Sequence, residues 1–293
     1  AFNEEVKKRR IEPFFNIRKE ALELVREGKW SGHFEYVVVD EAQDLTPTAL
    51  CLMAEVCKSA DGLFFASDVK QSIYSRNYTW ATAHPMLQFK GRTSLLKKNY
   101  RSTAEIDKAA FDVLEKGGNS DVVVSESLHN GALPILLNGV ESAAQGEWAA
   151  KFIRQMSRHL RMKTSAAAVL VPNKDIGMKL AKDISAAGVP TQYFPGRDLD
   201  LKQDIVKVLT LHSAKGLEFP VVVVCGFEEG TYPARDDFEE AEVYLERMRH
   251  ERKLLYVGMT RAMRGLMVIR NKECVHEALV NLKADNWHVE EVI

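Results

Sequence analysis

Short runs of β-branched and aromatic residues recur along this 293-residue chain, and each run stops at polar residues. The clearest runs are residues 36–39, 63–66, 167–171 and 221–224, and longer stretches with helical periodicity lie between them. Runs this short and this apolar are typical of strands buried in a parallel sheet. Their alternation with helices predicts an α/β fold of parallel sheets flanked by helices.

The length of the chain is enough for one large domain or for two domains of ordinary size. We place a boundary near residue 95. Residues 92–97 are a further candidate strand, and residues 119–142 are polar and predicted to be irregular. Residues 236–264 are predicted to be mainly helix, and residues 266–269 are predicted to form the last strand.

The composition argues against several classes of protein. The net charge of −1 gives no basic field over the whole chain, so a partner with phosphates must be held by local basic groups. No apolar run approaches the roughly 20 residues of a membrane span. The four cysteines form no metal-like pair and are predicted to be buried free thiols. We therefore expect a cytoplasmic protein without a membrane partner.

Two adjacent carboxylates, Asp40 and Glu41, follow the first predicted strand in the segment DEAQD. Ligands of open α/β sheets bind beyond the carboxyl ends of the strands. One carboxylate there can hold Mg²⁺, and the other can orient and deprotonate a water molecule. A solvated acidic turn is the alternative for an isolated pair, but the strand before it and Gln43-Asp44 after it favour a metal–phosphate site.

Two more segments carry groups that suit a phosphate or a base. DVKQSIY places Gln71 and Tyr74 after the second strand, where a glutamine can sense a phosphate or a water. LLKKNYRS places Tyr100 and Arg101 before a helix, where an aromatic ring can stack on a base and an arginine favours phosphate. An ordinary polar loop and a surface strand end are the alternatives.

The C-terminal third contains two further candidates. VLTLHSAKGLEF carries His212, Lys215 and Glu218 in a turn between two strands, and ERKLLYVGMTRA places Arg261 at the end of a helix. Taken alone, a structural histidine, a solvated lysine and a charge-laced helix are the simpler interpretations.

In their order along the chain, DEAQD, DVKQSIY, LKKNYRS, TLHSAKGLEFPVV and LLYVGMTRA closely resemble motifs II to VI of UvrD/Rep-type superfamily 1 DNA helicases. The resemblance implies two RecA-like domains with ATP in the cleft between them. It also implies ATP and Mg²⁺ as cofactors, and 3′-to-5′ movement on single-stranded DNA or at a duplex junction. Residues 1–30 would be the helical tail of an accessory subdomain. Residues 31–95 would be the C-terminal half of the first RecA-like domain, and residues 96–293 the second.

The resemblance also implies roles for residues around the nucleotide. Asp40 would bind Mg²⁺, Glu41 would activate water and Gln71 would sense the γ-phosphate. Tyr100 would stack on adenine and Glu218 would contact the ribose.

The same resemblance implies roles for five positions in transition-state stabilisation and DNA binding. Arg101 and Arg261 would act as arginine fingers that stabilise charge in the transition state. Tyr74, His212 and Lys215 would face single-stranded DNA, where aromatic rings can stack on bases.

The sequence departs from the family pattern at the phosphate site. It contains no GxxxxGK[ST] loop, and Gly28-Lys29 is followed by Trp30. Such a loop supplies backbone N–H groups and a lysine to the phosphates. We therefore expect the isolated chain to be inactive as an ATPase.

Three hypotheses account for the missing loop. In the first, the chain is the C-terminal portion of an ATP-dependent helicase, and the loop lies in a missing N-terminal half. In the second, it is a pseudo-helicase that acts as a DNA- or protein-binding module without hydrolysis. In the third, a partner chain supplies the loop.

Overall fold

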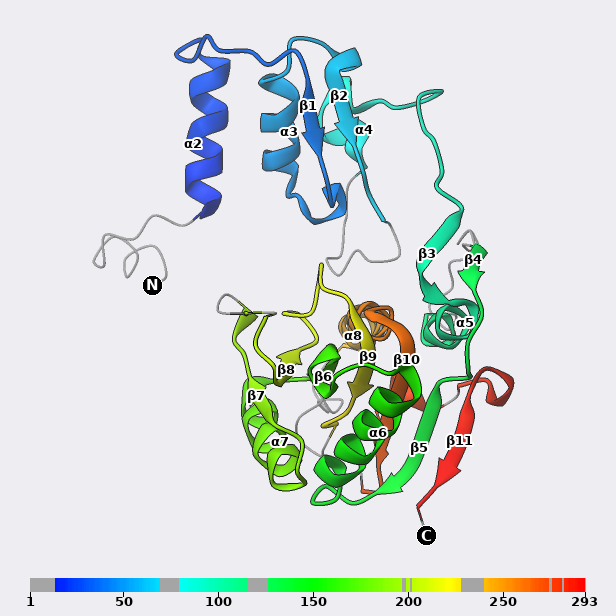
Figure 1. Ribbon diagram of the computed structural model, residues 1–293. Coiled ribbons are helices and arrows are strands. Elements are labelled where there is room, and N and C mark those ends of the chain that lie inside the picture. Colours follow the sequence, from blue (N-terminus) through cyan, green and yellow to red (C-terminus); the bar gives the residue numbers. More distant parts are fainter. Residues whose placement is uncertain are drawn as a thin grey trace, which may run out of the picture. The chain divides into compact units, whose positions relative to one another are not determined.

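The computed structural model describes residues 14–68, 79–114, 126–196, 199–200, 202–227, 240–273, 276–280 and 282–292. The chain forms two compact units, here called unit 1 (Ala1–Leu95) and unit 2 (Leu96–Ile293), and both can be followed in Figure 1. The roles predicted for residues 1–30, 31–95 and 96–293 stay predictions.

Unit 1 contains a two-stranded parallel sheet, β1 (Val37–Val39) and β2 (Leu63–Phe65). Helix α3 (Pro47–Glu55) begins after Thr46, whose hydroxyl accepts a hydrogen bond from the backbone N–H of Ala49. Its apolar side chains pack on the inner face of the sheet together with residues from α4 (Trp80–Ala83) and from the segment after it. Helix α2 (Phe14–Arg26) lies beside α3, where Arg26 pairs with Glu55 at 3.1 Å.

The outer face of this small sheet is exposed. Val38 of β1 and Phe64 of β2 are neighbours in register, and their exposed fractions are 76% and 73%. Their strand neighbours Val37, Val39 and Leu63 are buried on the inner face. The prediction of two strands here is confirmed, but the prediction that they are buried holds for one face only, because α3 and α4 cover that face alone.

Unit 2 is built on a seven-stranded sheet in the order β11-β5-β10-β9-β6-β8-β7, in which every neighbouring pair is parallel. The strands are β5 (Ile135–Val140), β6 (Ala167–Val171), β7 (Thr191–Tyr193), β8 (Val206–Thr210), β9 (Phe219–Val224), β10 (Ala262–Asn271) and β11 (His288–Glu291). The α/β prediction, with parallel sheets flanked by helices, is confirmed.

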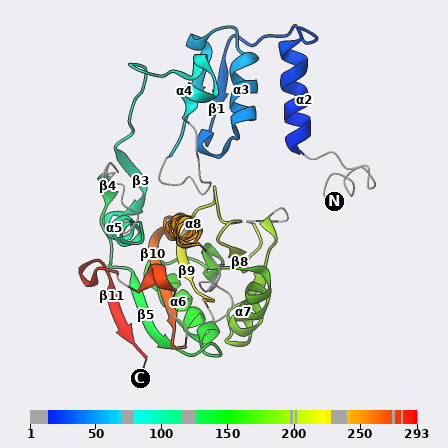
Figure 2. The same cartoon turned by 180° about the vertical axis from the view of Figure 1, so that it is seen from behind.

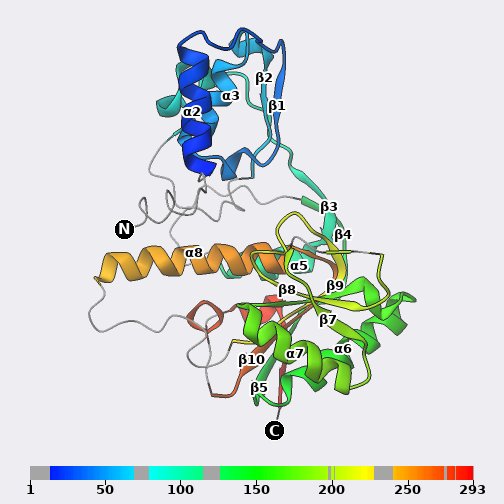
Figure 3. The same ribbon diagram turned by 90° about the vertical axis from the view of Figure 1, so that its left-hand side faces the viewer.

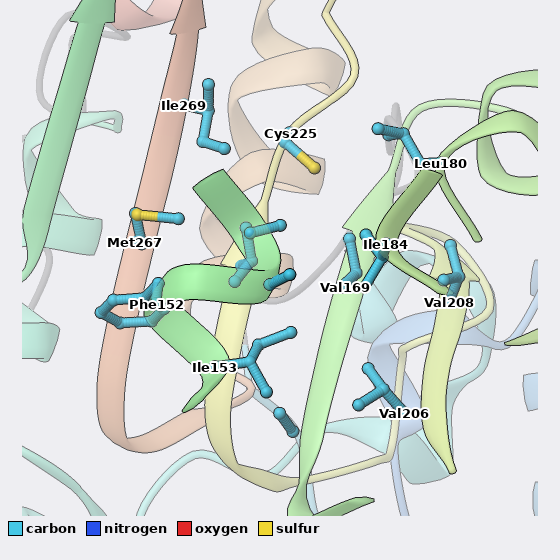
Figure 4. Close-up of a cluster of buried hydrophobic side chains, with 14 of the residues drawn as sticks. Phe152, Ile153, Val169, Leu180, Ile184, Val206, Val208, Cys225, Met267 and Ile269 are labelled. Atoms are coloured by element: carbon cyan, nitrogen blue, oxygen red, sulfur yellow. The ribbon is translucent and has the colours of Figure 1, made fainter. Parts of the chain in front are cut away.

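Helices cover both faces of this sheet. In Figure 3, α6 (Gln145–Leu160) and α7 (Lys174–Ala186) lie on one side, and α5 (Ala104–Asp112) and α8 (Ala241–Met259) lie on the other. Figure 4 shows side chains of α6 and α7 packed in the main core against side chains of β6, β8 and β10. Gly188 follows the end of α7, and its φ of 85° is a left-handed conformation that glycine adopts without strain.

A small parallel ladder of β3 (Lys98–Thr103) and β4 (Glu126–His129) lies next to α5 in both Figure 1 and Figure 2. The strand predicted at residues 92–97 is therefore wrong by several residues. The observed strand begins at Lys98, because its pairing with β4 begins where Lys98 lies opposite Glu126.

Three other predictions need correction. The region 119–142, predicted to be irregular, contains β5, whose apolar pattern is interrupted by Asn138 and Gly139. The strand predicted at residues 266–269 is confirmed as part of β10, but the last strand along the chain is β11. The helix predicted for 236–264 ends at Met259, because the chain enters β10 at Ala262.

Cys51, Cys57 and Cys225 are buried free thiols, as predicted, while Cys274 lies outside the described residues. Among the helices of the described part of the chain, none is long and apolar enough to cross a membrane.

Candidate functional site

The acidic pair of unit 1 lies at the carboxyl end of β1, and both residues are exposed. Asp40 Oδ1 accepts a hydrogen bond from the backbone N–H of Glu41 at 2.8 Å. Glu41 has a left-handed backbone (φ 51°), which is uncommon for a residue with a Cβ and is concentrated at functional sites. The sharp turn at Glu41 lets two neighbouring carboxylates project beyond the strand.

Gln43 ties this turn to the end of the neighbouring strand. The residue is buried, its amide nitrogen donates to the Glu41 carboxylate, and its amide oxygen accepts from the backbone N–H of Asp68 at 3.0 Å. The sequence predicts no role of its own for Gln43, which serves only as context for the acidic pair. Its burial and its two polar contacts now identify it as the residue that orients Glu41.

The carboxylates fit Mg²⁺ only together with a nucleotide. Among the described residues, no group of three or more His, Cys, Asp or Glu side chains could hold a metal ion. Magnesium commonly takes one or two protein carboxylates and completes its shell with water and phosphate oxygens. Asp40 can supply one such ligand, but these residues alone do not form a metal cage.

Gln71 and Tyr74, predicted to contact the γ-phosphate and DNA, lie outside the described residues.

In unit 2 the structure brings together two residues that lie far apart in the sequence. Arg101, in β3, pairs with Glu218, directly before β9, with Nε and Oε1 2.5 Å apart. Tyr100 precedes this arginine and has an exposed fraction of 67%. An arginine–carboxylate pair can bind a charged ligand, and an exposed aromatic ring can stack on a flat one such as a nucleotide.

Arg261 differs from the sequence-based expectation of a projecting arginine. It is 2% exposed, and its guanidinium donates to the carbonyl oxygens of Val257 (Nε, 2.9 Å) and Leu217 (Nη1, 3.3 Å). Its own carbonyl accepts from the N–H of Phe219 at 2.9 Å. Arg261 therefore binds the backbone on both sides of Glu218, the residue that pairs with Arg101.

Arg264 is a residue that the sequence did not single out. Its Nη1 donates to the carbonyl oxygen of Arg101 at 3.1 Å and links β10 to β3. Within a stretch predicted as a charged helix, nothing in the sequence marks this arginine as different from its neighbours.

The turn after β8 carries the predicted DNA-facing residues His212 and Lys215. Thr210 and Ser213 shape this turn through a hydrogen bond between their hydroxyls at 2.9 Å. The His212 ring lies 6.0 Å from that of His250 on α8. Desolvation of the ring, and then the nearby His250, lower the pKa of His212, while Glu251 opposes the shift.

Two family models match the chain. Residues 4–94 match the UvrD/REP helicase N-terminal domain, and residues 196–273 match the UvrD-like helicase C-terminal domain.

Similar curated proteins are DNA helicases. DNA helicase II of Escherichia coli (strain K12) is 51% identical over 67 residues, which are 23% of this chain and 9% of that protein. ATP-dependent DNA helicase PcrA of Bacillus subtilis (strain 168) is 41% identical over 91 residues, 31% of this chain and 12% of that protein. A probable DNA helicase of Mycoplasma pneumoniae is 28% identical over 244 residues, 80% of this chain and 43% of that protein. Each alignment spans less than half of the relative.

Among solved structures, the C-terminal domain of a possible DNA helicase from Lactobacillus plantarum WCFS1 is similar, with a TM-score of 0.48 and 20% sequence identity. The match covers 65% of this chain and 98% of that structure.

Proposed function

We propose that this chain, which matches both domain models of the UvrD-like helicases, is part of a DNA helicase motor that couples ATP hydrolysis to movement along single-stranded DNA. Two curated proteins that the chain resembles are DNA helicase II and the ATP-dependent DNA helicase PcrA. Movement from 3′ to 5′, action at a duplex junction and use of ATP with Mg²⁺ belong to this proposal. So does the hypothesis that the phosphate-binding loop lies in a polypeptide segment outside these 293 residues.

The observation that carries the proposal is the pair formed by Arg101 and Glu218. Tyr100, which precedes Arg101 in β3, is exposed. Arg101 and Glu218 come from two motifs that are far apart in the sequence, and a shared ligand site gives a reason for their convergence. We assign adenine stacking to Tyr100, ribose contact to Glu218 and phosphate contact to Arg101.

The remaining predicted residues take complementary roles in the proposal. Asp40 would hold Mg²⁺ and Glu41, oriented by Gln43, would accept a proton from the attacking water. Gln71 would sense the γ-phosphate. Bound Mg²⁺ would supply neutralisation of phosphate charge.

Arg261 has a narrower role in this structure. To act as an arginine finger, its guanidinium would have to leave the carbonyls of Val257 and Leu217. In the conformation seen here it supports Glu218, and a direct phosphate contact stays a prediction.

DNA would lie against the turn after β8. His212 and Lys215 are proposed to contact the strand, together with Tyr74, through stacking and phosphate attraction. The lowered pKa of His212 means that this histidine is neutral near pH 7 and contributes no positive charge to DNA binding.

The test is ATP hydrolysis by the 293-residue chain with and without single-stranded DNA, alone and after addition of a polypeptide that carries the phosphate-binding loop. We expect DNA-stimulated turnover only in the mixture, and we expect Glu41→Gln to abolish it. Glu35→Gln, an exposed acid just before β1, is the matched control and should keep full turnover. Failure to bind single-stranded DNA and to hydrolyse ATP in every mixture would contradict the proposal.

A second candidate function, a DNA- or protein-binding module without hydrolysis, is favoured by one observation: the sequence has no GxxxxGK[ST] loop. It predicts tight binding of single-stranded DNA or of a co-purified protein with no turnover in any mixture. Fluorescence anisotropy with labelled DNA measures the binding, and the absence of ATP hydrolysis in every mixture separates this candidate from the first.

A further inference from the structure

Arg101 is held at three points by three different parts of unit 2. Its Nε pairs with Glu218, its carbonyl oxygen accepts from Arg264, and its backbone N–H donates to Asn99 Oδ1 at 2.8 Å. We propose that Asp107 on α5, acting through Asn99, is a positioning residue that fixes Arg101 for its phosphate contact. The phosphate contact itself rests on the proposed function.

Asn99 is the middle of this arrangement. Its amide nitrogen donates to Ser102 Oγ at 2.7 Å and to Asp107 Oδ2 at 2.5 Å. Its amide oxygen is thereby turned toward the backbone N–H groups of Arg101 and Ser102. The orientation matters, because a flipped amide would present N–H groups to those N–H groups and lose both bonds.

Asp107 determines which way the Asn99 amide points. An ionised carboxylate only accepts hydrogen bonds, so the Asn99 group that faces it must be the donor. The other carboxylate oxygen, Oδ1, accepts from Ser102 Oγ at 2.5 Å, which holds the carboxylate on the same side. One side chain on α5 therefore fixes the direction of two polar side chains in β3.

The part of β3 that is held in this way is not a core segment. Ser102 and Thr103 are buried, but the Arg101 side chain is partly exposed and Tyr100 is mostly exposed. An exposed side chain gains little free energy from packing, and holding it in one rotamer costs conformational entropy. A charge-assisted network around an exposed arginine is better explained by a ligand that needs the arginine in one place.

A role for Asp107 in helix stability must be separated from positioning. Asp107 lies in the first turn of α5, where a negative charge interacts favourably with the helix dipole. Glu105 is its matched control. It lies in the same turn, and its carboxylate also accepts a backbone hydrogen bond, from the N–H of Gly131 at 2.7 Å, but it has no link to Arg101.

The experiment compares Asp107→Asn with Glu105→Gln in the full 293-residue chain. The first readout is the NMR signal of the Arg101 Nε–H group, assigned through its loss in Arg101→Lys. The second readout is the affinity for a fluorescent ATP analogue with Mg²⁺, measured after addition of a polypeptide that carries the phosphate-binding loop, with Arg101→Lys as the reference for loss of the contact. Thermal unfolding confirms that all variants fold.

We expect Asp107→Asn to shift the Arg101 signal and speed its hydrogen exchange, because an amide can donate toward Asn99 and let it flip. Affinity for the ATP analogue should fall roughly three- to tenfold, the effect of one hydrogen bond. Glu105→Gln should leave both readouts unchanged.

An unchanged Arg101 signal in Asp107→Asn overturns the positioning role, whatever happens to nucleotide affinity. An altered signal with unchanged affinity, while Arg101→Lys weakens binding, also overturns it. An altered signal, together with a wild type that does not bind the ATP analogue even after addition of the polypeptide that carries the phosphate-binding loop, supports the control of Arg101 by Asp107 and counts against the proposed function instead.

Discussion

In unit 2, β6 lies between β9 and β8, helices pack on both faces of the sheet, and every residue from Ala167 to Val171 is buried. In unit 1, β1 is equally apolar, yet Val38 is as exposed as a surface residue. A strand that is apolar at every position is typical of a sheet covered on both faces. The comparison teaches that the residues of β1 and β2 suit a two-sided sheet, while the structure of unit 1 covers one side.

The largest effect should come from the covered sheet. Leu170→Ala removes a fully buried side chain of β6 and should lower the free energy of unfolding of unit 2 by about 2–5 kcal/mol. Urea denaturation of the full chain, followed by the signal of unit 2, measures the loss. A loss below 1 kcal/mol would mean that this core can collapse around the cavity.

The second-largest effect should be a dependence of the stability of unit 2 on pH. Burial, and then the positive charge of Arg252, lower the pKa of His276 to about 3. The unfolded chain therefore binds a proton near pH 6.5 that the folded unit does not bind, and stability falls as the pH drops below that value. Between pH 7 and pH 5 we expect a loss of about 2 kcal/mol, or roughly 4–8 °C in Tm.

His276→Asn is the variant that tests this dependence. His276 Nδ1 accepts from the N–H of Ala278, and asparagine can keep this capping bond without taking up a proton. Calorimetric scans of both proteins at pH 7 and pH 5 should show a smaller fall of Tm for the variant. Equal falls would assign the acid sensitivity to other groups.

A smaller effect is expected at the turn after β1. Glycine adopts the left-handed conformation of Glu41 without a clash of Cβ. Glu41→Gly should therefore leave unit 1 about 1 kcal/mol more stable than Glu41→Ala, in chemical denaturation followed through Trp30 and Trp80. The opposite order would show that the turn is not strained.

The smallest effect should come from the uncovered face. Phe64→Ala shortens a side chain that is 73% exposed and should change the stability of unit 1 by less than about 0.5 kcal/mol. Leu63→Ala, one position earlier and buried, is the matched control and should cost several times more. If the two substitutions cost the same, the outer face is covered in solution, and the contrast with unit 2 disappears.

How far the sequence predicts the fold depends on how a strand is covered. The run at residues 167–171 is apolar throughout because β6 is buried on both sides, and it was predicted with the observed bounds. Strand β11 has the sequence HVEE at the edge of the sheet, pairs only with β5 and is mostly exposed, so it carries no apolar pattern. Strand β5 was missed because Asn138 and Gly139 interrupt it.

The sequence likewise predicts only part of the candidate site. The motifs supplied Tyr100, Arg101 and Glu218 as separate residues, but the pairing of Arg101 with Glu218 depends on strand topology that the motifs do not contain. Arg264 and Asp107 could not be predicted, because charged residues in predicted helices are usually solvated. Only their hydrogen bonds distinguish them.

The position of β5 has a consequence for synthesis on the ribosome. Both neighbours of β5 in the sheet, β10 and β11, are made long after it, and Asn138 and Glu291, joined by a hydrogen bond, are 153 positions apart. At roughly 5–20 residues per second, β5 waits about 8–30 s for its edge partner. During that time its backbone groups are open to other chains, so unit 2 should depend on chaperones most strongly before β10 and β11 emerge.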